Sequence, residues 1–219
     1  RGTSVYLVDR VVPMLPEVLS NGICSLNAHE DRYAMTCMME IDDSGTVVNY
    51  RIRPSIIHVG RRCSYKEVYK ALEENIIPDD LQDFMPMLRD LAEISKILNR
   101  MRRRRGALDF DFPEYKVLLD LDGTPLRIVK RDRTMAERLI EECMLIANET
   151  VATHLKNTHR TSVYRIHESP SEEKLDLFQK VLNYLGQNLV LSADGVTPRD
   201  FQKILDVVKW QDIEQVAQI

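Results

Sequence analysis

Few side chains in this sequence are spaced in a way that could support catalysis or metal binding. The sequence contains no Gly-rich phosphate loop, no His-Glu-x-x-His zinc motif and no Ser, His and Asp in the order of a catalytic triad. Adjacent acids occur at Asp42-Asp43 and Asp79-Asp80, where a hairpin turn and a helix N-terminus are predicted. Turns and helix caps account for such acids without a metal ion.

Two aromatic residues have side chains suited to binding. Tyr6 and Phe110 are aromatic residues in extended segments beside Gly or Pro, and such rings can stack on nucleic-acid bases for about 1–3 kcal/mol each. Taken alone, each is more often a core residue. Glu141 is followed directly by Glu142, and neighbours on a helix point about 100° apart, so the two cannot form a facing acid/base pair. His167 ends a predicted strand and is interpreted as a structural histidine.

The strongest predicted helix covers residues 82–105 and ends in four arginines, Arg102, Arg103, Arg104 and Arg105. Its apolar residues recur at spacings of 4, 3, 4 and 3, which is typical of one buried stripe. Cations interact favourably with the C-terminal end of a helix dipole, and Gly106 suits the position after the last turn. Because capping does not need four arginines, a patch that contacts phosphates is the alternative explanation.

The rest of the sequence alternates between predicted hairpins and helices. Turns at residues 42–45 and 122–123 predict two β-hairpins, and capping boxes that begin at Ser64 and Thr134 predict two helices. The expected strands are residues 33–41, 46–59, 115–121, 125–130 and 163–167; the other expected helices are 65–74, 134–155, 170–184 and 197–209. The pattern predicts one α+β unit, with a mixed or antiparallel sheet of β-hairpins packed by several long helices.

Composition excludes several classes of protein. The net charge of −4 is unlike the basic balance of a stand-alone nucleic-acid binder. No apolar run reaches the 18 residues of a membrane-spanning helix, so no membrane partner is expected. The four cysteines form no Cys-x-x-Cys pair; we interpret them as buried, reduced thiols of a cytoplasmic protein, and we expect no zinc site.

The first 26 residues form the most distinctive segment. A short apolar strand carries Tyr6, and Pro13 and Pro16 make the connection that follows it rigid. A turn at Asn21-Gly22 then leads into a second short apolar run. Because the sequence begins in mid-pattern and without Met, residue 1 is not expected to be a natural start.

This segment closely resembles the catalytic (RNB) domain of the ribonuclease II/ribonuclease R exoribonucleases. The resemblance begins with residues 2–6 (Gly-Thr-Ser-Val-Tyr), 12–16 and 19–26. It continues through residues 106–114 (Gly-Ala-Leu-Asp-Phe-Asp-Phe-Pro-Glu), the helix at 136–148 and residues 164–170. It therefore covers essentially the whole chain and is closer to the ribonuclease R branch.

The resemblance implies a processive 3′→5′ exoribonuclease that hydrolyses single-stranded RNA to nucleoside 5′-monophosphates. In this family, four aspartates of one motif hold a divalent metal, usually Mg²⁺, and an activated water attacks the phosphate. An arginine motif supports the transition state. By this resemblance the aspartate motif would lie before residue 1 and the arginine motif after residue 219.

Residues 1–219 are accordingly expected to be the central part of one RNB catalytic domain, truncated at both ends, with no cold-shock or S1 domain. The chain alone would lack the catalytic residues and the metal ligands, and would be inactive. Its parent enzyme is expected to be a cytoplasmic monomer. The alternative is a non-catalytic RNA-binding or interaction module that retains the scaffold.

Three RNA-binding residues transfer by position from the resemblance. Tyr6 matches a tyrosine that packs against the 3′-terminal nucleotide, and Glu141 matches a glutamate beside that nucleotide. Phe110 matches an aromatic residue that closes a stack of bases, and it is preferred to Phe112 because it directly follows Gly-Ala-Leu-Asp. The preference for Glu141 over Glu142 rests on the same alignment.

Overall fold

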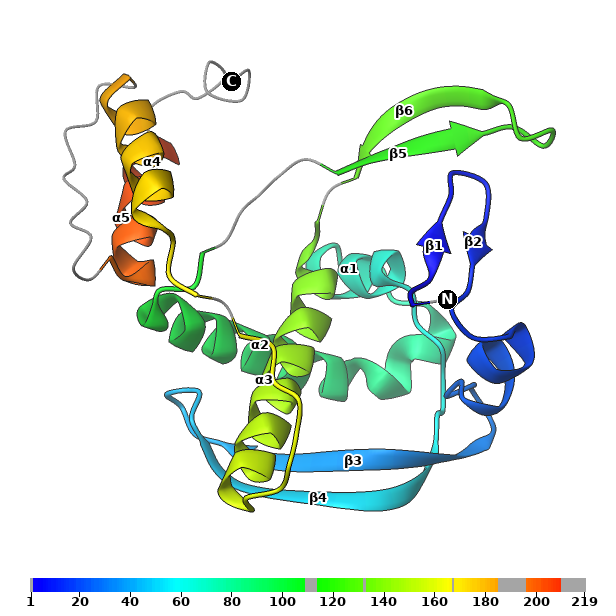
Figure 1. Cartoon of the computed structure of the whole chain (residues 1–219). Helices are drawn as coiled ribbons and strands as arrows, with labels where there is room; N and C mark the ends of the chain where they lie inside the picture. The colour runs from blue at the N-terminus through cyan, green and yellow to red at the C-terminus, as the bar shows by residue number, and fades with distance from the viewer. Residues whose placement is uncertain (1, 109–113, 132, 167, 185–195, 210–219) are drawn as a thin grey trace.

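The computed structural model describes residues 2–108, 114–131, 133–166, 168–184 and 196–209. Its strands are β1 (Val5–Tyr6), β2 (Val11–Val12), β3 (Asp31–Ile41), β4 (Val47–His58), β5 (Glu114–Leu119) and β6 (Pro125–Arg131). Its α-helices are α1 (Tyr65–Glu73), α2 (Met85–Arg105), α3 (Met135–Asn157), α4 (Glu172–Tyr184) and α5 (Pro198–Lys209). The predicted α+β class is confirmed, and the described strands form three separate antiparallel pairs (Figure 1).

Both long hairpins turn on an aspartate, as the sequence predicts. The Asp42 carboxylate accepts hydrogen bonds from the Ser44 hydroxyl and from the backbone N–H groups of Thr46 and Ser44, and these bonds, above all the one from the Ser44 hydroxyl, lower the pKa of Asp42. Asp120 accepts the N–H groups of Asp122 and Thr124 in the same way. Glycine follows in each turn at positive φ, 88° at Gly45 and 82° at Gly123. Asp42 is therefore occupied in holding the turn.

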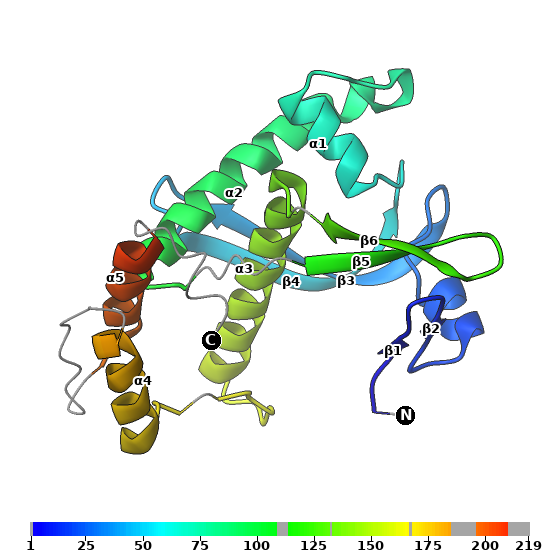
Figure 2. The same cartoon turned by 90° about the horizontal axis from the view of Figure 1, so that it is seen from above.

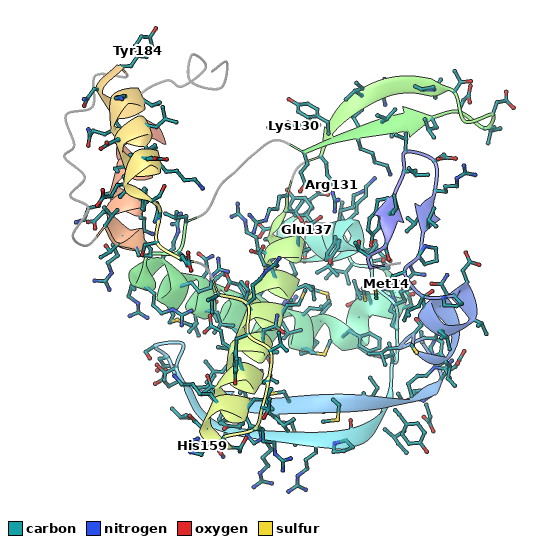
Figure 3. All side chains as sticks on the ribbon, in the orientation of Figure 1. Met14, Lys130, Arg131, Glu137, His159 and Tyr184 are labelled. Carbon is teal, nitrogen blue, oxygen red and sulfur yellow. The ribbon has the colours of Figure 1, made fainter. Side chains whose placement is uncertain are left out.

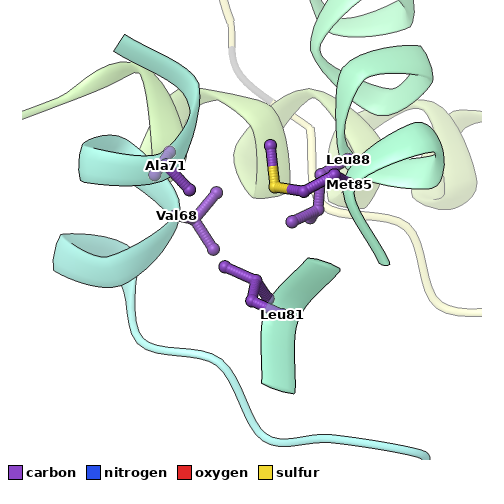
Figure 4. Packing of buried hydrophobic residues seen from close by; sticks show 6 residues of the cluster. Val68, Ala71, Leu81, Met85 and Leu88 are labelled. Atoms are coloured by element: carbon purple, nitrogen blue, oxygen red, sulfur yellow. The ribbon is translucent and has the colours of Figure 1, made fainter. Parts of the chain in front are cut away.

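The helices form the centre of the molecule. Capping boxes at Ser64–Glu67 and Thr134–Glu137 start α1 and α3, and Gly106 ends α2 with a left-handed φ of 97°. One apolar core joins α1, α2, the first turn of α3 and a 3₁₀ segment (Asp79–Phe84), through Val68, Ala71, Leu81, Met85, Leu88 and Ala136 (Figure 4). None of the described helices is long and apolar enough to cross a membrane.

Helices α2 and α3 cross, and the other elements are arranged around them. Both views place β3–β4 along one side of this pair, whereas α4 and α5 lie beside the C-terminal end of α2 (Figures 1 and 2). The Arg199 Nε of α5 donates to the Arg104 carbonyl, and the Gln202 side chain donates to the Ala107 carbonyl. One carbonyl group in the last turn of α2 and one just after the helix thus receive hydrogen bonds from a distant part of the chain.

Some local predictions are wrong. Residues 163–166 are not a strand: Val163 is 99% exposed, and none of the described strands pairs with this segment. The Asn21-Gly22 pair lies inside a short helical segment (Val18–Ile23), and α4 begins at Glu172, two residues after the predicted start at residue 170. The four thiols are free, as expected, but Cys24 and Cys63 are exposed, not buried.

An ion-pair cluster at the start of α1 predicts how stability depends on pH. Arg61 donates to Glu67 at 2.8 Å and to Asp80 at 2.9 Å, and the bond from Arg61 lowers the pKa of Glu67 to about 2 from its ordinary value near 4.5. A carboxylate with a lowered pKa stabilises the folded state above about pH 4.5, and this contribution is lost as the pH falls toward 2. We expect Glu67→Gln to destabilise the protein at pH 6, and this difference to shrink by pH 2.

Urea unfolding at the two pH values measures this difference. Glu74→Gln, at the other end of α1, is the matched control. A Glu67→Gln deficit that stays constant between pH 6 and pH 2 would contradict the role given to this carboxylate.

Candidate nucleic-acid interface

Tyr6 lies in a short pair of antiparallel strands, the β1–β2 ladder, and is exposed to solvent. β1 pairs with β2 in the register Val5↔Val12 and Tyr6↔Val11. The Ser4 hydroxyl accepts the backbone N–H of Met14 at 3.0 Å, which ties the returning chain to the start of the strand. The Tyr6 residue is 78% exposed, so its ring is available for stacking. This placement agrees with the binding role inferred from the resemblance but does not test it.

The two adjacent glutamates of α3 have different environments. Glu142 is 3% exposed; it accepts a hydrogen bond of 2.9 Å from Asn99 Nδ2, and its Oε2 lies 3.5 Å from Arg102 Nε. Glu141 keeps 39% of its side chain exposed and pairs with Arg133, with Arg102 Nη1 3.9 Å away. Glu141 is therefore the glutamate that a ligand could reach, whereas Glu142 is part of the contact between α2 and α3.

Within the arginine run, some side chains contact other residues of the protein and others extend into solvent. Arg102 faces the two glutamates, and Arg105 holds both carboxylate oxygens of Glu149, at 3.0 and 2.7 Å, which raises the pKa of Arg105. Arg104 donates to the Ser44 carbonyl at the β3–β4 turn. Arg103 is exposed, and among the described residues no ion pair involves it. Phosphate contact by this run stays a prediction, and Arg103 is the arginine best placed for it.

The structure brings only some of the predicted residues together. Arg102 and Glu141 meet where α2 and α3 cross, but within the described segments no hydrogen bond or ion pair joins either to Tyr6. Both views place β1 and the C-terminal end of α2 on opposite sides of the molecule (Figures 1 and 2). Phe110, Phe112 and His167 lie outside the described residues.

Sequence reasoning missed the partners that hold this region. Asn99 and Glu149 had no assigned role, yet each joins α2 to α3. The sequence contained a signal for these contacts between helices. Arg102 and Arg105 are one turn apart, and Glu142 and Glu149 are two turns apart, so each pair lies on one helix face. Opposite charges on two amphipathic helices predict neighbours, although the crossing point has to be known to pair them.

The described residues do not fit a magnesium site. No group of three or more His, Cys, Asp or Glu side chains in the described part of the chain is arranged to hold a metal ion. Glu141 and Glu142, where α2 and α3 cross, pair with arginines.

Comparison with known proteins places the chain in a family. The family profile described as RNB domain matches residues 1–218. Ribonuclease R 1 of Lactococcus lactis is 42% identical over 217 residues, which make up 99% of this chain and 27% of that protein. The chain thus spans about a quarter of the length of this curated relative.

Solved structures agree with the sequence comparison. Mycoplasma genitalium RNase R in complex with ribose-methylated single-stranded RNA matches with a TM-score of 0.88 and 32% identity, over 94% of this chain and 32% of that chain. Yeast Ssd1, described as a pseudonuclease, matches with a TM-score of 0.62 and 18% identity over 87% of this chain and 23% of its own, which shows the fold alone. On the family profile and the identity to ribonuclease R, the chain belongs to the RNB domain family.

Proposed function

We propose that this chain is the central part of the catalytic domain of a processive 3′→5′ exoribonuclease, which hydrolyses single-stranded RNA to nucleoside 5′-monophosphates. The observation that carries the proposal is the match of nearly the whole chain to ribonuclease R, including a structure that holds single-stranded RNA. We further propose that the intact protein is a cytoplasmic monomer with RNA, and no membrane, as its partner.

In this proposal the residues of the chain hold the RNA end. The exposed Tyr6 ring stacks on the 3′-terminal base, and Phe110 stacks on a base further along the strand. Stacking of this kind contributes about 1–3 kcal/mol per base and reads no sequence, which suits a nonspecific degradative enzyme. The accessible Glu141 carboxylate, oriented by Arg133, can accept a hydrogen bond from a ribose hydroxyl, a group that distinguishes RNA from DNA.

In this proposal the ligands of the magnesium ion lie outside this chain. The described residues offer no suitable ligand set, so we place the aspartate ligands and the catalytic arginine in neighbouring parts of the intact protein. When bound, the metal would supply an activated water and stabilise charge on the phosphate. The part played by this chain is to bind the strand and fix its 3′ end.

A non-catalytic RNA-binding module is the second candidate. Such a module would bind RNA without a metal-binding cluster, and the described residues contain none. The coding sequence upstream of Arg1 separates the two candidates. An aspartate-rich motif there supports the enzyme, and its absence supports the module.

Degradation of RNA by the full-length gene product tests the proposal. With Mg²⁺ and 5′-labelled single-stranded RNA, we expect nucleoside 5′-monophosphates and one short end product. Tyr6→Ala should lengthen that end product, because the last base loses its stacking partner, whereas Tyr6→Phe should keep it. Gel electrophoresis of the labelled products measures both effects.

Tyr184→Ala is the matched control, since Tyr184 is 81% exposed on α4, far from Met14 and the β1–β2 ladder (Figure 3). The 219-residue chain alone should show no Mg²⁺-dependent cleavage. RNA left intact by the full-length protein would overturn the enzyme assignment. An unchanged end product from Tyr6→Ala would remove Tyr6 from the site.

A further inference from the structure

A basic cleft lies between α1, α2 and the first turn of α3. Its volume is about 310 Å³, and its lining includes Lys96, Arg100, Arg138, Ser95, Asn99 and Glu73. Three cations and one carboxylate give this cleft a positive balance, on a chain whose net charge is −4. None of the contacts assigned above to the RNA end uses these side chains.

The cations of the cleft are available for a ligand. In the described segments no ion pair or hydrogen bond involves the side chain of Arg100 or Arg138, and both residues are exposed. Lys96 pairs with Glu93 at 3.5 Å, but both side chains are more than half exposed, and such a surface pair is worth about 0–1 kcal/mol. This availability contrasts with Arg102 and Arg105, which glutamates of α3 neutralise.

The α2 wall of the cleft carries two polar side chains beside the apolar Ala92, and one of these two is held in place. Ser95 is 8% exposed, and Asn99 donates one amide hydrogen to the buried Glu142, which fixes the orientation of that amide. Met135, the first residue of α3, also lines the cleft. Hydrogen-bond donors and positive potential together favour an anionic ligand.

The arrangement of the cations favours a chain of anions over a single one. Lys96, Arg100 and Arg103 recur at spacings of 4 and 3 residues, so they line one face of α2 over about 10 Å at a rise of about 1.5 Å per residue. Arg138 stands beside this row, one turn before Glu141 on α3. Arg138 therefore brings this group of cations close to Glu141, the glutamate predicted to contact the 3′-terminal nucleotide.

We propose that this cleft is a second RNA contact, in which Lys96, Arg100 and Arg138 neutralise phosphates of the RNA backbone and Arg103 extends the row. The inference rests on the proposed function, because it takes RNA as the ligand. It places the phosphate contact on the face of α2 that lines the cleft and not on the whole arginine run.

The salt dependence of RNA binding by the full-length protein tests the cleft. Without Mg²⁺, so that no cleavage occurs, a fluorescent 2′-O-methyl RNA is titrated at several salt concentrations. The triple variant Lys96→Gln/Arg100→Gln/Arg138→Gln should bind about tenfold more weakly at 0.1 M salt. Its slope of log affinity against log salt should fall by about 2, since each single-strand phosphate contact contributes about 0.7.

Two further variants distinguish binding in the cleft from a general effect of net charge. Arg51→Gln/Arg53→Gln/Lys66→Gln removes the same charge from exposed positions outside the cleft and should leave affinity and slope unchanged. Arg100→Lys/Arg138→Lys keeps the charge and should restore the slope. Inorganic phosphate at constant ionic strength should not displace the RNA.

Each outcome separates the cleft from the proposed function. A wild-type protein that binds no RNA overturns the proposed function, and this inference with it. A wild-type protein that binds RNA, with equal losses in the cleft variant and the control variant, overturns the cleft alone, because only net charge then matters. Displacement by millimolar inorganic phosphate identifies a small-anion site and overturns the backbone contact.

Discussion

Glu142→Ala is expected to destabilise the protein by about 3 kcal/mol, because it leaves the largely buried charge of Arg102 with only a longer contact, 3.9 Å, to the more exposed Glu141. Glu142 is 3% exposed and the Arg102 side chain 17% exposed, so water cannot replace the lost carboxylate. Arg102 Nε and Glu142 Oε2 are 3.5 Å apart, and neither atom has a hydrogen-bond partner within the described structure. The pair thus depends on mutual charge neutralisation. Thermal unfolding followed by circular dichroism should show a loss of about 10 °C.

Two variants separate the buried pair from its surroundings. Glu141→Ala removes the adjacent carboxylate, which is 39% exposed, and should cost about 0–1 kcal/mol. The double variant Arg102→Met/Glu142→Leu should recover most of the loss, because replacing a buried ion pair by apolar groups is often neutral or stabilising. If Glu141→Ala and Glu142→Ala cost the same, the contrast drawn between these two neighbours is wrong.

Gly45→Ala should destabilise the protein by about 2–4 kcal/mol, for two separate reasons. The φ of Gly45 is +88°, which costs a residue with a Cβ about 1–2 kcal/mol. A Cβ at Gly45 would also lie 2.8 Å from Met101 Cβ and 3.4 Å from the Ile97 carbonyl oxygen, both on α2. Neither atom belongs to a flexible side-chain end, so the turn or the helix has to move. Urea unfolding measures the loss.

Gly123→Ala is a control that isolates the backbone effect. Gly123 occupies the equivalent turn of β5–β6 with a φ of +82°, and no atom lies within 4 Å of its added Cβ. This variant should therefore cost about 1–2 kcal/mol, and the excess cost at Gly45 is the contribution of the contact with α2. Equal costs at the two glycines would show that the turn of β3–β4 does not depend on α2.

The parts of the fold that the sequence predicted are those set by neighbouring residues. The Ser64–Glu67 and Thr134–Glu137 capping boxes involve residues three apart, and the hairpin turns at Asp42 and Asp120 involve residues two and four apart. A wrong prediction came from the same local reasoning. Residues 163–166 have strand-forming side chains, but a strand needs a partner. None of the described strands pairs with this segment, and the sequence alone does not show this.

The candidate site was predicted less completely, because its geometry depends on how α2 and α3 cross. The accessibility of Glu141 and the burial of Glu142 follow from this crossing, since Arg102 lies 40 positions before Glu142. The bond between Arg105 and Glu149 spans 44 positions. For the same reason, the sequence alone could not show which arginines of the run contact other residues of the protein and which face solvent.

The contact of α5 with the end of α2 has a consequence for the order of assembly. The hydrogen bonds from Arg199 and Gln202 join residues 95 positions apart, and closing so long a loop costs chain entropy before any contact repays it. The hairpins and capped helices close loops of a few residues and can form early. Once α3 has packed on α2, the effective loop is much shorter. We therefore expect α5 to dock late on a preformed pair of helices, and its release to leave that pair folded.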